Sequence, residues 1–190
     1  MSTGDLESIY SGFVYRFYRE DHLIGLLTGI QGLLERYGSL RDAFDAHVSA
    51  YSDYRPALDG FVSELYGAAV FPPKMISKPS RGSGCKRLFL YLRWMIRKDR
   101  VDPGTWSGLD RSRLLIPVDA HMLAISHRLG ITDRKTGNAK TSVEITDFFR
   151  TIDSADPVRF DFALTRLGIH PDLDYNELPV KGGSSEFERL

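Results

Sequence analysis

The apolar positions of this chain recur mostly with the three- to four-residue spacing of amphipathic helices. Residues 85–99 give the strongest helical pattern, because apolar side chains fill most of the segment between basic ones. The same spacing predicts further helices, in chain order, over residues 5–18, 21–38, 39–51, 54–67, 119–130, 140–152 and 156–168. Clear alternating strands and hairpin dipeptides do not stand out, so the sequence predicts an all-α fold.

Polar and turn-forming residues mark the expected helix ends. Short polar side chains suited to N-capping are Asp21, Ser39, Asp119 and either Thr141 or Ser142. Proline suits the first turn of a helix, which places Pro157 at the start of the last one. Glycines just beyond the helices are Gly38, Gly130 and Gly168.

We expect one helical domain over residues 1–176. It comprises N-terminal helices (1–73, shortened relative to similar sequences), a basic segment (74–100) and a closing part that carries Asp119 (101–176). Three prolines and two glycines in residues 71–84 interrupt regular structure between the first two parts. Residues 177–190 are polar and rich in glycine and serine, which predicts a flexible tail.

Charge is distributed unevenly, although the net charge is zero. Residues 1–73 contain five Lys/Arg and ten Asp/Glu, whereas residues 74–100 contain nine Lys/Arg and one aspartate. Residues 101–190 contain eleven and fourteen. Local potential rather than net charge attracts a polyanion, so the basic segment is either a nucleic-acid contact or a solvated basic face.

The composition also excludes several classes of protein. Apolar residues make up 42% of the chain, too many for a disordered protein. No apolar run approaches the roughly 18 residues that span a bilayer, and the first residues do not resemble a secretory signal. The single cysteine, Cys85, cannot form an internal disulfide or a four-thiolate cluster. The histidines show no zinc-ligand spacing, so we expect no metal or cofactor. The single cysteine and the absence of a secretory signal lead us to expect a cytoplasmic protein.

The stretch RGSGCKR combines a flexible turn with a predicted helix start. Gly82 and Gly84 permit positive φ and close approach of another chain, and the helix N-terminus favours an anion. Basic residues at i, i+7, i+11 and i+14 of the helix share one stripe: Lys86, Arg93, Arg97 and Arg100. The rest of this helix is apolar, so the stripe needs acidic partners inside the protein or a polyanion outside it.

A second motif, LLIPVDAHML, places Asp119 at the start of a predicted helix. Considered alone, Asp119 is most simply an N-cap. The two motifs together resemble the helix-hairpin-helix DNA glycosylase superfamily. Its Gly-x-Gly-x-Lys hairpin matches residues 82–86, and its Val-Asp-x-His segment matches residues 118–121.

The resemblance covers roughly residues 75–170. EITDFFRTI and PVRFDFALTRLGI are similar to the closing helices of the oxoguanine-excising branch. The whole chain also resembles a widespread, functionally uncharacterised microbial family. Two features depart from the superfamily pattern: Ser80-Arg81 replaces the usual Leu-Pro before the hairpin, and 33 residues separate Lys86 from Asp119, more than in most members.

The resemblance implies a base-excising enzyme that acts on damaged duplex DNA, with possible lyase activity. In its bifunctional members the hairpin lysine, here Lys86, attacks the sugar of a flipped nucleotide, and the aspartate, here Asp119, stabilises positive charge on that sugar. The backbone of DNA would contact Gly82, Ser83, Gly84, Arg87, Arg93 and Arg97. We expect a nucleoid-associated monomer without an iron–sulfur cluster.

Further site residues are inferred from rough alignment. Phe160, Asp161 and Phe162 occupy the region that holds the flipped base; the alternative is that both phenylalanines are core and Asp161 is a surface residue. His121 and Trp106 are assigned structural roles. Two rival functions stay open: a non-catalytic DNA- or RNA-binding module of the same fold, and an interaction domain whose arginine stripe pairs with the acidic N-terminal helices.

Overall fold

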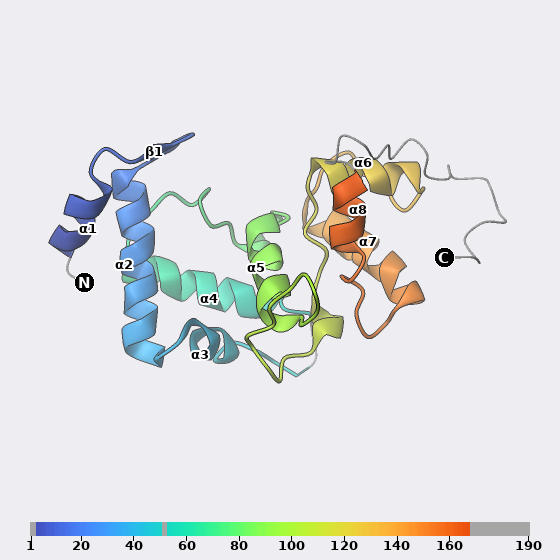
Figure 1. Cartoon of the computed structure of the whole chain (residues 1–190), viewed down its shortest axis with the longest axis horizontal. Coiled ribbons are helices and arrows are strands. Elements are labelled where there is room, and N and C mark those ends of the chain that lie inside the picture. Colours follow the sequence, from blue (N-terminus) through green and yellow to red (C-terminus); the bar gives the residue numbers. More distant parts are fainter. Residues whose placement is uncertain (1–2, 51–52, 168–190) are drawn as a thin grey trace. The chain divides into compact units, whose positions relative to one another are not determined.

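The computed structural model describes residues 3–50 and 53–167 and divides into two compact units, Met1–Arg81 and one that begins at Gly82. Eight α-helices and two short strands account for the regular structure of the described residues, apart from two short 3₁₀ helices (Figure 1). The all-α class is therefore confirmed. The single-domain organisation stays a prediction, and the predicted tail, residues 177–190, lies outside the described residues.

The first unit packs its helices around an apolar core. Its elements are α1 (Thr3–Tyr10), β1 (Val14–Tyr15), β2 (Tyr18–Arg19), α2 (Glu20–Tyr37), α3 (Leu40–Asp45), α4 (Arg55–Ala68) and the 3₁₀ helix Pro79–Arg81. Helices α2 and α4 approach closely at Gly29, where a Cβ atom would lie 2.9 Å from the Leu65 carbonyl oxygen. The buried side chains of the core include Leu33, Phe44, Leu58, Phe61, Val62 and Leu65.

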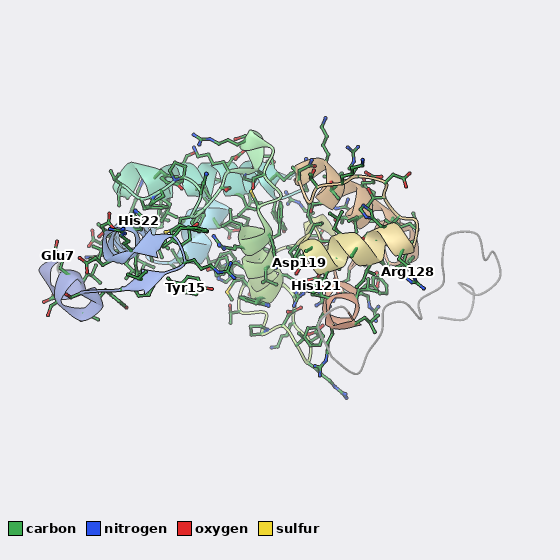
Figure 2. The ribbon with its side chains drawn as sticks, turned by 90° about the horizontal axis from the view of Figure 1, so that it is seen from above. Glu7, Tyr15, His22, Asp119, His121 and Arg128 are labelled. Carbon is green, nitrogen blue, oxygen red and sulfur yellow. The ribbon has the colours of Figure 1, made fainter. Side chains whose placement is uncertain are left out.

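The beginning of the first unit differs from the sequence prediction. The helix expected over residues 5–18 ends at Tyr10, and an antiparallel hairpin of β1 and β2 follows. Gly12 and Arg16 have φ angles of +76° and +55°, which a continuous helix does not contain. The next helix begins at Glu20 with Arg19 as its N-cap, so Asp21 lies in the first turn instead of capping it. Figure 2 shows Tyr15 on this hairpin.

The second unit contains the remaining helices. They are α5 (Lys86–Ile96), the 3₁₀ helix Arg111–Arg113, α6 (Ala120–Arg128), α7 (Ala139–Ile152) and α8 (Asp161–Leu167). A buried extended run, residues 114–118, leads into α6. Core side chains come from this run and from the apolar helix faces: Leu88, Phe89, Leu92, Leu114, Leu115, Ile116, Met122, Ile125, Ile145 and Phe149.

Several helix ends in this unit also differ from the prediction. Helix α5 ends at Ile96, so Arg97 and Arg100 lie beyond it. Asn138 caps α7, because its side chain accepts hydrogen bonds from the amides of Lys140 and Thr141, and neither Thr141 nor Ser142 is the cap. Helix α8 begins at Asp161, four residues after Pro157. The predicted caps Ser39 and Asp119 are confirmed.

Candidate active site

The glycine turn, residues 82–85, leads into α5 and pairs with the segment at the start of α7. Gly82 has a φ angle of +75°, as expected for a glycine in a tight turn. Ser83 forms an antiparallel bridge with Asn138, and the Ala139 amide donates a 3.2 Å hydrogen bond to the Gly82 carbonyl. The segment that caps α7 therefore fixes the turn.

Gly84 allows close approach of a second chain, and that chain belongs to the protein itself. A Cβ atom on Gly84 would lie 2.3 Å from the carbonyl oxygen of Gly137. Gly84 is buried, Ser83 half-buried and Gly82 exposed. Gly137 thus fills the space beside the Cα atom of Gly84, and the contact of Gly84 with the DNA backbone stays a prediction.

Lys86 and Asp119 lie together although 33 residues separate them in the chain. The Lys86 ammonium, Nζ, donates a 3.0 Å hydrogen bond to Oδ2 of Asp119. Oδ1, the other carboxylate oxygen, accepts a 2.8 Å bond from the Met122 amide and so caps α6. Asp119 therefore acts as an N-cap and as the partner of Lys86 at once. Figure 2 shows Asp119 and His121 at the start of this helix.

The two side chains differ in their exposure. Asp119 is 15% exposed and Lys86 is 47% exposed. Burial alone would raise the pKa of Asp119, but the Met122 amide, the hydrogen bond and charge of Lys86, and the charge of His121 together lower it. Asp119 therefore remains an anion at neutral pH, beside an amine that a ligand can reach from solvent.

The arginine–aspartate network consists of Arg93, Arg97, Asp99, Asp102, Asp156 and Asp161. Arg93 pairs with Asp102 at 3.0 Å and with Asp161. Arg97 pairs with Asp156 at 2.9 Å, with Asp99 at 2.8 Å and with Asp102. The network joins α5 to the turn at residues 99–102, to the segment before α8, and to α8 itself.

The prediction that Arg93 and Arg97 contact DNA phosphates is wrong. Their side chains are only 5% and 7% exposed, and carboxylates of the second unit occupy their donors. The partners of these two arginines are therefore acidic residues of the protein itself, one of the two alternatives that the sequence left open. These partners lie in residues 99–161, so the pairing of the stripe with the acidic N-terminal helices is also wrong.

The proposed base-pocket residues are arranged differently from either expectation. Asp161 is 3% exposed and bound to Arg93, whereas Phe162 is 41% exposed. Phe160 stacks on Phe149 at 5.2 Å between ring centroids. Asp161 is therefore neither a surface residue nor a free acceptor for a base, because Arg93 and Thr165 already occupy its oxygens.

Burial is the main cause that raises the pKa of Asp161, and the negative charge of Asp119 adds to it. Arg93 and the hydroxyl of Thr165 oppose this rise. The net direction agrees with the composition of the network, in which four carboxylates outnumber the guanidinium groups of Arg93, Arg97 and Arg111, the last 3.9 Å from Asp156. Burial of Asp161 thus opposes its ionisation, while the ion pair with Arg93 favours it.

The remaining predicted residues have clear positions. Trp106 is buried and packs edge-on against Tyr91 at 5.4 Å, as expected for a structural residue. His121 is exposed at the start of α6, and its structural role stays a prediction. Arg87 is exposed next to Lys86. Gly168, the glycine expected beyond the last helix, lies outside the described residues.

Sequence reasoning missed two features of the site. One is the segment Gly137–Asn138, which fixes the glycine turn. Asn138 directly precedes a helical pattern, and asparagine is a common N-cap, so the sequence contained a signal for it. The other is the set of carboxylates that neutralise the stripe. The acidic excess of residues 101–190 was a weak signal for them, but it did not identify Asp102, Asp156 and Asp161.

Among residues 3–50 and 53–167, no group of three or more His, Cys, Asp or Glu side chains is arranged to hold a metal ion. None of the helices in the described chain combines the length and apolar character that crossing a bilayer requires.

Comparisons with known proteins give one match. No curated protein and no solved structure matches the chain. A family model described as "Protein of unknown function (DUF2400)" matches residues 2–170, which is most of the 190-residue chain. The chain therefore belongs to the DUF2400 family.

Proposed function

We propose that this protein is a DNA glycosylase that excises an oxidised base, with Lys86 as nucleophile and Asp119 as its electrostatic partner. The observation that carries the proposal is the 3.0 Å contact between the Lys86 ammonium and the Asp119 carboxylate. Sequence spacing alone does not require these residues to meet. Their meeting at the end of a glycine turn supports the functional assignment drawn from the resemblance.

The chemistry assigns a separate task to each side chain. The Lys86 ammonium first loses a proton to solvent, and the free amine then attacks C1′ of the damaged nucleotide. A bond forms between Nζ and C1′, the glycosidic bond between C1′ and the base nitrogen breaks, and the base leaves with the bonding electrons and takes up a proton from solvent. The sugar gains positive charge in the transition state, and a nearby carboxylate stabilises that charge. The lowered pKa of Asp119 suits this electrostatic task, because the group remains ionised and does not store a proton.

The damaged nucleotide must leave the duplex to reach Lys86. Extrusion of a base costs a few kcal/mol, and damaged pairs cost least. Loss of a proton and ring opening then convert the amine adduct into a Schiff base between Lys86 and C1′. Hydrolysis releases the enzyme, and β-elimination of the 3′ phosphate is the alternative outcome that cleaves the strand.

Borohydride trapping tests the proposal, because borohydride reduces a Schiff base to a stable amine. The protein is incubated with duplexes that contain oxoguanine, uracil or an abasic site, and the products are separated under denaturing conditions. We expect a covalent protein–DNA band that Lys86→Ala abolishes. Lys98→Gln is the matched control, because Lys98 is an exposed lysine of the same basic segment and should keep the band.

Two results would overturn the proposal. A band that persists in Lys86→Ala would assign the nucleophile elsewhere. Absence of both a band and base release for every damaged duplex, while DNA still binds, would replace the enzyme by a non-catalytic DNA-binding module. The ion pair itself is the observation that favours this second candidate, because an ammonium held by a carboxylate is not yet a nucleophile.

A further inference from the structure

Five cations of the basic segment lie within residues 74–87: Lys74, Lys78, Arg81, Lys86 and Arg87. This stretch contains no acidic residue. Lys86 pairs with Asp119, but among the described residues Lys74, Lys78 and Arg81 form no ion pair. Arg93 and Arg97 are neutralised inside the second unit, whereas Lys74, Lys78 and Arg81 keep positive charge that an anion can use.

A pocket of about 130 Å³ lies in the first unit beside two of these cations. Its lining residues are Tyr66, Pro73, Ile76, Lys78 and Arg81. The pocket thus combines an ammonium and a guanidinium with a phenol ring and two apolar side chains. One of these lining residues, Arg81, directly precedes Gly82 of the glycine turn in the chain.

The walls of this pocket are fixed by contacts within the first unit. The Tyr66 ring stacks on Phe71 at 4.3 Å, and its hydroxyl donates a 2.9 Å hydrogen bond to the Ile76 carbonyl. Lys78 donates a 2.7 Å bond to the Ser63 hydroxyl, which leaves the other ammonium protons available. The pocket is therefore formed before any ligand binds.

The backbone next to Arg81 is also held in place. The Ser80 amide donates to both carboxylate oxygens of Asp59, at 3.0 and 3.1 Å. Asp59 thereby orients the 3₁₀ helix Pro79–Arg81, whereas the Arg81 side chain stays exposed. A guanidinium can bind an anion in bidentate fashion, and its planar fork loses less side-chain entropy per hydrogen bond than an ammonium does.

We propose that this pocket binds a backbone phosphate of duplex DNA through Lys78 and Arg81. The two cations supply charge and donors for one phosphate group, and Pro73 and Ile76 offer an apolar surface to the adjoining sugar. The choice of DNA as the polyanion rests on the proposed function. The phosphate chemistry rests on the pocket and on its two cations.

Fluorescence anisotropy with a labelled duplex tests this site. The probe is a duplex with a central tetrahydrofuran abasic analogue, titrated with full-length protein between about 50 and about 200 mM salt. Lys78→Gln and Arg81→Gln should each weaken binding about fivefold. Each should also reduce the slope of log K against log salt by about 1, because each removes one phosphate contact.

Two control variants separate phosphate contact from other effects. Ser63→Ala removes the hydrogen bond of Lys78 without changing the charge, and should bind within about twofold of wild type. Arg100→Gln removes an exposed cation of the same basic segment beyond the far end of α5, and should also bind within about twofold. Thermal unfolding checks that all four variants fold.

The outcomes distinguish this proposal from the proposed function. Unchanged affinity of Lys78→Gln and Arg81→Gln, or no binding of wild type at about 50 mM salt, would overturn the site. So would tighter binding of a duplex RNA of equal length, because the proposal names DNA. Weakened binding in the two variants, with neither a borohydride-trapped band nor base release by wild type, would support the site and overturn the glycosylase. Trapping at saturating DNA should survive in both variants, since neither changes Lys86.

Discussion

At the scale of the residue, Asp119 combines two tasks that different oxygens perform. Oδ1 caps α6 through the Met122 amide, and Oδ2 holds Lys86. An N-cap needs only an acceptor oxygen, whereas stabilisation of a cationic sugar needs a charge. Substitutions that keep one property and remove the other can therefore separate the structural task of Asp119 from its catalytic task.

Asp119→Asn and Asp119→Ala form such a pair. Asparagine caps a helix about as well as aspartate, so we expect Asp119→Ala to lower the free energy of unfolding by about 1 kcal/mol more than Asp119→Asn does. Both variants lose the charge, and both should reduce the rate of base excision by at least about a hundredfold. Urea unfolding and single-turnover excision measure the two effects. Near-normal excision by Asp119→Asn would remove Asp119 from the proposed mechanism.

At the scale of the element, the arginine–aspartate network fixes the helix that begins with Lys86. Arg93 lies two turns into α5 and reaches Asp102 and Asp161, the first residue of α8. These carboxylates are 0% and 5% exposed, so neither can turn to water if its partner is removed. A buried ion pair contributes little net stability, but loss of one member leaves an uncompensated charge.

Arg93→Met should therefore lower the free energy of unfolding by about 3 to 5 kcal/mol. Arg93→Lys keeps the charge without the planar fork and should lose less. Lys98→Met, an exposed position in the same segment, should stay within about 0.5 kcal/mol of wild type. Chemical denaturation of the three variants makes the comparison. A loss below about 1 kcal/mol for Arg93→Met would show that Asp161 and Asp102 do not depend on this guanidinium.

The elements also show what the sequence could predict. Helical spacing identified every α-helix of the described chain, because the period of buried positions is a local property. Asp119 was identified as an N-cap for the same reason. The hairpin Val14–Arg19 was missed, since its aromatic positions also fit a helix and only positive φ at Gly12 and Arg16 breaks the pattern.

Long-range pairing was harder to predict than helices. The stripe of α5 was recognised, but the identity of its partners depends on how residues 99–161 fold back on α5. Gly84 likewise indicated a close neighbour, but no local pattern identified that neighbour as Gly137, 53 residues later in the chain. The pairing of Lys86 with Asp119 was expected only through the resemblance to a known superfamily.

At the scale of the whole molecule, zero net charge conceals two groups of cations that differ in their partners. The buried Arg93 and Arg97 are neutralised by aspartates, whereas the exposed Lys74 and Arg81 and the half-buried Lys78 lack carboxylate partners in the described chain. A count of charges along the sequence cannot distinguish these two groups. The neutralised group bears on stability and on its dependence on pH, and the other group bears on association with an anion.

The pH dependence of stability should reveal the raised pKa of Asp161. Burial raises the pKa of Asp161 in the folded protein, while the unfolded chain has the ordinary value of about 4. A raised pKa contributes stability that is complete below the unfolded value and is lost as pH rises through the folded value. Wild type should therefore become less stable relative to Asp161→Asn as pH increases above about 4, and the difference should become constant above the folded pKa.

Urea unfolding of both proteins at a series of pH values from about 4 to about 8 measures this difference. The lowered pKa of Asp119 acts in the opposite sense, because its contribution is lost as pH falls through the folded value. Asp119 is present in both proteins, so its contribution largely cancels in the difference. A difference that is independent of pH would mean that Asp161 ionises as it does in the unfolded chain. One that grows in the opposite direction would mean that Arg93 outweighs burial and holds Asp161 as an anion at every pH at which the protein is folded.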